Sequence, residues 1–229
     1  MSTIEVCYLI ATIAAAAELL TLRISVRQQS PNHMLFFSAL LLASCGYFAV
    51  SISKTVEEAV LATKLTYIST FLPLFVLFTI AEFCKTRIPR PITYGLTALT
   101  IADMVFACSI GYSKLFYREY ALGTWKGTSY LFRTYGPLHI IHYILLFFDI
   151  LFALLIIFRT LRVKRNVSRR SVMFLLFGLC LTMLVYYFER KMHTPFDVVP
   201  ILYVLFGTIY LGIAIRLQRY DASEAMLTE

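Results

Sequence analysis

The stretch Leu138–Leu161, LHIIHYILLFFDILFALLIIFRTL, decides the class of fold. A helix that crosses a bilayer needs about 20 mostly apolar residues. This run meets that length, and it carries the acidic residue Asp149 near its middle. It therefore predicts a transmembrane helix with a polar face.

Six similar runs lie around this stretch, so seven spans are predicted. The other six are Ile4–Val26, Met34–Ile52, Val60–Ala81, Ile92–Tyr112, Ser171–Phe188 and Val198–Ile215. Of the 229 residues, 59% are hydrophobic and 15% are charged, whereas soluble domains have about 45–50% and about 25%. We expect an all-α fold, a polytopic seven-helix membrane bundle over residues 1–216. A soluble enzyme is excluded, and so is an outer-membrane barrel, whose strands alternate polar and apolar residues.

The distribution of positive charge predicts the orientation of this bundle. With the N-terminus outside, the cytoplasmic segments hold most of the Lys and Arg residues, and Arg159–Arg170 is the densest cluster. Such residues concentrate on the cytoplasmic side, so we predict the N-terminus outside and the C-terminus inside. This pattern accounts for the net charge of +8, and no nucleic-acid partner is expected. Residues 217–229 are polar, as expected for the start of a cytoplasmic linker to an output domain or for a simple C-terminus.

The fifth span carries a polar face. His139, His142 and Asp149 follow one another at spacings of three and seven residues, which places them on one side of a helix. Ionisable side chains inside a membrane are costly and usually mark function. The two histidines supply at most two metal ligands, and the five cysteines have no CxxC spacing. We therefore predict neither a metal site nor a cofactor.

The third and sixth spans add polar faces near the same side of the membrane. Glu57 and Lys64 lie two turns apart with Tyr67 near them, and Tyr186 and Glu189 share a face of the sixth span. If the three faces converge, they form an outward pocket for a small-molecule or lipid-like ligand. The alternative is that charges at helix ends extend to the interface.

The long segment Ser113–Pro137 between the fourth and fifth spans is rich in aromatic residues. It is expected to be a lid over the pocket or an aromatic belt at the headgroups. As a lid, it would place Trp125 or a tyrosine over the apolar part of a ligand, while Lys64 and Arg190 would favour an anionic group. The predicted ligand-binding residues are Glu57, Lys64, Tyr67, Trp125, His139, His142, Asp149, Tyr186, Glu189 and Arg190.

A further acid, Glu18, follows the Ala-rich run Ala11–Ala17 in the first span. Small residues let helices approach closely, so Glu18 is expected to be buried against a neighbouring helix. Glu18 and Asp103, together with Asp149, also suggest an alternative function. A small transporter or channel would use them as steps along a polar path.

Several pieces of the chain resemble one family in order and spacing. They are Gly46–Val50, Glu57–Tyr67, Tyr135–His139 followed by His142-Tyr143, and Asp197–Ile201. Together they are similar to the N-terminal seven-transmembrane sensor region of bacterial histidine kinases. In such proteins the membrane region precedes a cytoplasmic histidine kinase or diguanylate cyclase domain, and Arg219–Asp221 is similar to the exit toward a cyclase.

This resemblance implies a signal-input module in the bacterial inner membrane that works as a homodimer. The chain contains no kinase H-box, ATP lid or cyclase signature. The resemblance therefore implies a chain without catalysis of its own, which relays a ligand signal to the output domain.

Overall fold

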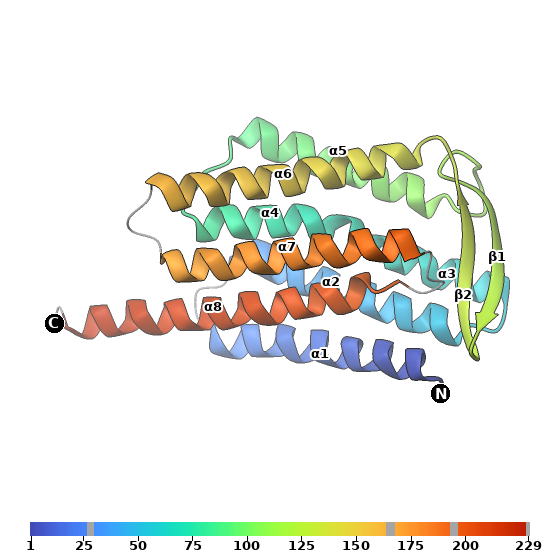
Figure 1. The fold of residues 1–229 in the computed structure, drawn as a ribbon, viewed down its shortest axis with the longest axis horizontal. Coiled ribbons are helices and arrows are strands. Elements are labelled where there is room, and N and C mark those ends of the chain that lie inside the picture. The colour runs from blue at the N-terminus through green and yellow to red at the C-terminus, as the bar shows by residue number, and fades with distance from the viewer. Residues whose placement is uncertain (27–29, 164–167, 193–196, 228–229) are drawn as a thin grey trace.

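The computed structural model describes residues 1–26, 30–163, 168–192 and 197–227; at 190, 192 and 217–227 it describes the backbone alone. Within these residues, seven helical segments are long and apolar enough to cross a membrane. They lie side by side as one bundle (Figure 1), which confirms the predicted fold class. The N-terminus and a β-hairpin lie at one end, here called the hairpin end. The C-terminus lies at the other, the C-terminal end.

The helices follow the predicted runs closely. They are α1 (Thr3–Ser25), α2 (Pro31–Ile52), α3 (Val56–Thr66), the 3₁₀ helix η1 (Tyr67–Thr70), α4 (Phe71–Phe83), α5 (Arg90–Cys108), α6 (His139–Val163), α7 (Arg169–Met192) and α8 (Val199–Leu227). Their starts follow local signals: Ser2 and Glu5 form a capping box at α1, and Thr55 and Glu58 form one at α3. In such a box each side chain bonds a backbone N–H that the helix leaves free.

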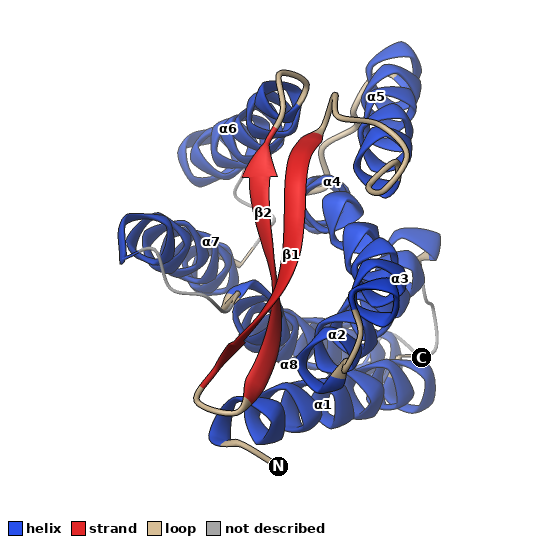
Figure 2. Cartoon of the chain, turned by 90° about the vertical axis from the view of Figure 1, so that its right-hand side faces the viewer, coloured by secondary structure: helices blue, strands red, loops and turns tan. Residues whose placement is uncertain are grey.

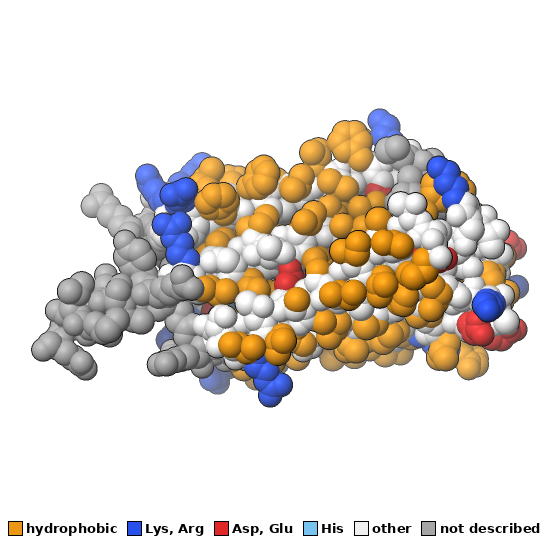
Figure 3. All heavy atoms as spheres, turned by 90° about the horizontal axis from the view of Figure 1, so that it is seen from below, with side chains coloured by type: hydrophobic (Ala, Val, Ile, Leu, Met, Phe, Trp, Pro, Cys, Tyr) orange, Lys and Arg blue, Asp and Glu red, His pale blue; other side chains and the backbone are white. Residues whose placement is uncertain are grey.

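The surface of the bundle is apolar, as a membrane-spanning protein requires. Ile10, Leu61 and Phe147 are among the large hydrophobic side chains that it exposes. Figure 3 shows apolar side chains over the middle of one face, with Lys and Arg mainly toward the ends.

The third span is broken, whereas the sequence predicted one continuous helix over Val60–Ala81. The chain changes from α3 to the 3₁₀ turn η1 and back to the α-helix α4. Pro73 explains the break. Proline has no N–H to donate to the carbonyl four residues earlier, Ser69, and its ring clashes with that carbonyl. The preceding turn therefore tightens, and short 3₁₀ stretches inside helices often accompany functional sites.

The segment Ser113–Pro137 contains a β-hairpin, which the sequence did not predict. β1 (Tyr117–Trp125) pairs antiparallel with β2 (Thr128–Tyr135). The turn is Lys126-Gly127, and both residues have positive φ, 50° and 81°. This geometry is typical of the tightest hairpin turns. Figure 2 shows the hairpin lying across the end of the bundle.

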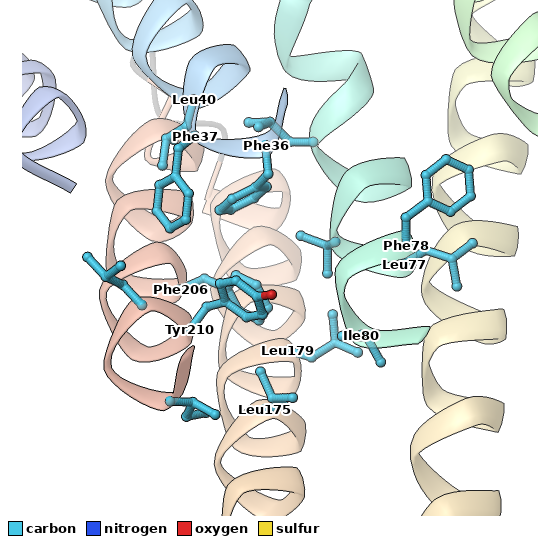
Figure 4. Packing of buried hydrophobic residues seen from close by; sticks show 14 of the residues in the cluster. Phe36, Phe37, Leu40, Leu77, Phe78, Ile80, Leu175, Leu179, Phe206 and Tyr210 are labelled. Atoms are coloured by element: carbon cyan, nitrogen blue, oxygen red, sulfur yellow. The ribbon is translucent and has the colours of Figure 1, made fainter. Parts of the chain in front are cut away.

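Two hydrophobic clusters hold the bundle together. The larger one joins α1, α2, α4, α6, α7 and α8, and in it Phe36 and Phe37 pack against Phe206 and Tyr210 (Figure 4). The smaller one lies under the hairpin. Gly46 lets α2 and α3 approach closely, because a Cβ there would lie 2.6 Å from the backbone nitrogen of Thr66.

Candidate functional site

A cavity of about 390 Å³ lies in the hairpin-end half of the bundle. Its walls come from η1 and α4 on one side and from α6, α7 and the start of α8 on the others. The hairpin segment supplies part of the lining through Phe116, Tyr117, Arg133 and Tyr135. A volume of this size suits a small organic ligand.

An ion pair fastens the hairpin to the start of α8. The Arg133 guanidinium lies 3.2 Å from the Asp197 carboxylate, and the Tyr8 hydroxyl of α1 donates to the Asp197 carbonyl at 2.8 Å. The Arg133 guanidinium also lies 5.6 Å from the centre of the Tyr117 ring. Burial raises the pKa of Tyr117 well above its usual value, although Arg133 lowers it in part. Tyr117 is therefore a neutral phenol at physiological pH.

His139 and His142 lie below the hairpin with different surroundings. His139 is buried and stacks on the Tyr135 ring, with centroids 4.0 Å apart and an angle of 9°. His142 Nδ1 lies 2.7 Å from the buried carboxylate of Asp103 on α5. This contact favours a proton on Nδ1 and leaves the other ring nitrogen, Nε2, as the acceptor when the ring is neutral.

Asp149 lies deeper in the cavity, among groups from three helices. It is 3% exposed on α6, and Tyr203 of α8 interacts electrostatically with both Asp149 and Tyr186 of α7. Below this level the lining is apolar. It includes Val76, Ala153, Leu179 and Phe206. The cavity thus changes from charged and phenolic groups under the hairpin to hydrocarbon at its floor.

Comparison with known proteins assigns this architecture to a family. A family model described as the N-terminal 7TM region of histidine kinase matches residues 6–222. The chain belongs to this family. It is a multi-pass membrane protein, and the 7TM region of histidine kinases is a sensor, or input, module. A search of curated proteins finds no significant match.

The cavity of this 7TM region brings together half of the predicted site residues. They are Tyr67, His139, His142, Asp149 and Tyr186. The shared face of α6 is the reason for three of them, since side chains at these spacings project to the same side of a helix. Their role in ligand binding stays a prediction.

Glu57 and Lys64 do not line the cavity of the 7TM region. The buried face of α3 consists of small residues, Ala59, Thr63 and Thr66. Glu57 and Lys64 lie on the other side of the helix. Glu57 is exposed, and the Lys64 ammonium lies 4.6 Å from the centre of the Tyr112 ring. The predicted convergence of this face was wrong, because η1 separates Tyr67 from the helix that carries the two charges.

Three other predicted residues also lie apart from the cavity or outside the description. Trp125 is at the hairpin tip, where it lines a small pocket of about 40 Å³ and lies beside Lys126. Glu189 is buried on α7 but is not part of the cavity lining. The Arg190 side chain lies outside the described residues.

The sequence did not single out several cavity residues as ligand-binding. They are Tyr47, Tyr117, Arg133, Asp197 and Tyr203. A signal existed for two of them, because Tyr47 and Asp197 lie in the pieces that resemble the family. The pairing of Arg133 with Asp197 spans 64 residues, and no local pattern reports a contact across that separation.

The other two acids of the predicted transport path, Glu18 and Asp103, have hydrogen-bond partners on neighbouring helices. Glu18 is buried, as predicted, and accepts a hydrogen bond of 2.5 Å from the Thr208 hydroxyl of α8. Neither Glu18 nor Asp103 belongs to the described lining of the cavity. Over the described ranges, no three His, Cys, Asp or Glu side chains are grouped as metal ligands.

Proposed function

We propose that this chain is the signal-input module of a bacterial receptor and that its ligand binds in the cavity under the hairpin. The bound state would be relayed by α8 to a cytoplasmic histidine kinase or diguanylate cyclase domain. The chain itself performs no catalysis in this proposal, and the receptor works as a homodimer in the inner membrane. The hairpin end faces the outside of the cell and the C-terminal end faces the cytoplasm.

One observation carries this proposal: the helix that forms a wall of the cavity is also the helix that leaves the bundle. Val199, Leu202 and Tyr203 line the cavity at the start of α8, and α8 continues without a break to Leu227. A ligand acts only through its different affinities for two arrangements of a protein. A ligand in contact with α8 meets that requirement directly.

The transporter alternative has less support. Its path needs Glu18, Asp103 and Asp149 along one route, but only Asp149 lines the cavity. Glu18 bonds Thr208, and Asp103 pairs with His142. The two acids therefore have structural partners in separate helix contacts.

A matched pair of substitutions tests the proposal. The chain is joined after Leu227 to a histidine kinase output domain, and autophosphorylation is measured in nanodiscs. Ala153→Leu adds volume to the cavity floor, whereas Ala102→Leu adds the same volume on the exposed surface of α5. We expect Ala153→Leu to shift the output several-fold and Ala102→Leu to leave it unchanged. Equal output from both variants at equal folded yield would contradict the receptor proposal.

A further inference from the structure

We infer that the cavity selects an amphipathic organic cation, with Asp149 as its counterion, and that this ligand enters from the bilayer between α6 and α7. The inference rests on the proposed function, since it names the class of ligand for the same cavity. Two independent observations lead to it: the charges that line the cavity, and the exposure of the residues at its rim.

The first observation is a carboxyl group without a counterpart. Asp149 is nearly fully buried, and its Oδ1 oxygen has no hydrogen-bond partner among the described residues. The other carboxylate in the lining, Asp197, is paired with Arg133. His142 is held by Asp103, which lies outside the lining. Among the described residues, the positive charge in the lining, Arg133, is thus paired with Asp197, and Asp149 has no ion-pair partner.

The depth of Asp149 in the membrane makes a positively charged partner important. It lies ten residues from the start of α6, which corresponds to about 15 Å along the helix. At that depth an uncompensated carboxylate is costly, and a ligand that carries a cation offsets the cost. Aromatic side chains line the same cavity. Tyr203 interacts electrostatically with Asp149 and with Tyr186, and aromatic faces attract organic ammonium groups.

The second observation is that part of the cavity lining is also outer surface. Phe147 of α6 is 62% exposed, and Met183 and Tyr187 of α7 are 37% and 59% exposed. All three line the cavity. The side of the bundle between α6 and α7 therefore opens toward the hydrocarbon region. The hairpin, in contrast, lies across the end of the bundle (Figure 2), and Tyr117, Arg133 and Tyr135 from it line the cavity. A ligand with an apolar body reaches the cavity from the membrane.

The charge requirement is tested with three probes that each have a ten-carbon chain: decyltrimethylammonium, decanol and decanoate. Binding is measured as saturable stabilisation of the purified chain in phosphatidylcholine nanodiscs, with empty nanodiscs as the background. We expect the ammonium probe to bind tighter than both others. Asp149→Asn keeps the size of the side chain and removes its charge, and it should weaken ammonium binding by roughly tenfold or more. Glu57→Gln removes an exposed carboxylate and should leave binding unchanged.

Two results would overturn the cation assignment. One is equal affinity for decanol or decanoate, and the other is unchanged ammonium affinity in a folded Asp149→Asn variant. If that variant does not fold, the ranking of the three probes on the unchanged chain decides alone.

The route of entry is tested by narrowing the rim. Met183→Trp adds bulk where the lining meets the surface, while Leu184→Trp adds the same bulk at an exposed neighbour outside the lining. Met183→Trp should slow association of the ammonium probe several-fold, and Leu184→Trp should not. Equal association rates would contradict entry between α6 and α7.

These tests are separate from the test of the receptor proposal, which uses no ammonium probe. Ammonium selectivity without any change of kinase output in Ala153→Leu would refute the receptor role and keep the cation site. A changed output without ammonium selectivity would refute the cation site and keep the receptor role.

Discussion

At the scale of single residues, the ion pair of Arg133 and Asp197 connects two segments that are far apart in the sequence. Arg133 belongs to the hairpin, and Asp197 precedes the helix that leaves the bundle. Tyr8 adds a third attachment by donating to the Asp197 carbonyl. The contacts of Arg133 and Tyr8 with Asp197 thus hold the hairpin and the start of α8 in place relative to each other.

Arg133→Ala should destabilise the hairpin end. Removal of the guanidinium leaves the Asp197 carboxylate without its partner, and because both side chains are about a quarter exposed, we expect a loss of about 1–2 kcal/mol. Thermal unfolding and amide exchange of the hairpin measure the effect. Arg118→Ala removes an exposed arginine from the other strand and serves as the control. An equal loss in both variants would show that the pair contributes nothing specific.

At the scale of elements, the sequence predicted helices far better than their interruptions. A run such as Leu138–Leu161 needs only local composition to be identified, because the bilayer imposes the length and the apolar character. The break at η1 arises because Pro73 has no N–H to donate to the Ser69 carbonyl. The hairpin depends on the Lys126-Gly127 turn, which lacks the usual Asn-Gly or Asp-Gly signal. Both features decide which predicted side chains reach the cavity.

Pro73→Ala should convert η1 to regular helix. The alanine supplies the missing N–H and removes the ring, so the third span gains a hydrogen bond and becomes continuous. Tyr67 and Thr70 then turn relative to the cavity, and binding of decyltrimethylammonium should weaken several-fold while the stability to unfolding stays equal or rises. Amide exchange at 67–70 should slow.

Pro91→Ala is the matched control for this change. Pro91 lies in the first turn of α5, where its missing N–H has no helical partner to lose. Ligand binding should be unaffected there. If Pro73→Ala leaves both amide exchange and binding as they are, proline is not the cause of the break.

At the scale of the whole molecule, the seven spans found among the described residues place the start of α1 and the end of α8 at opposite ends of the bundle. The hairpin and the N-terminus lie at one end, and α8 runs out at the other. The charge distribution favours an exterior hairpin end, since Arg162 at the end of α6 and Arg169 and Arg170 at the start of α7 lie at the C-terminal end. The orientation stays a prediction, which the sequence alone permits because it depends on counts of residues and not on contacts.

Cysteine labelling in intact cells checks the orientation. Lys126→Cys at the hairpin tip should react with an impermeant reagent added from outside, because residue 126 is exposed. Arg162→Cys at the end of α6 should react only after the cells are opened. The five native cysteines require a parallel measurement on the unchanged chain. Labelling of position 162 from outside would reverse the orientation.

The unbroken length of α8 has a mechanical consequence for any domain attached to it. A helix of 29 residues is about 43 Å long, and each added residue rotates the attached domain by about 100°. A rotation of α8 at the cavity therefore turns a domain attached at its far end, and the angle at which that domain sits depends on the number of residues in between. Chimeric receptors joined beyond Leu227 should gain and lose activity periodically as single residues are inserted. An insertion of seven residues is nearly two full turns and should almost restore the original orientation of the attached domain. The linker therefore determines the angle of that domain as well as its distance from the membrane.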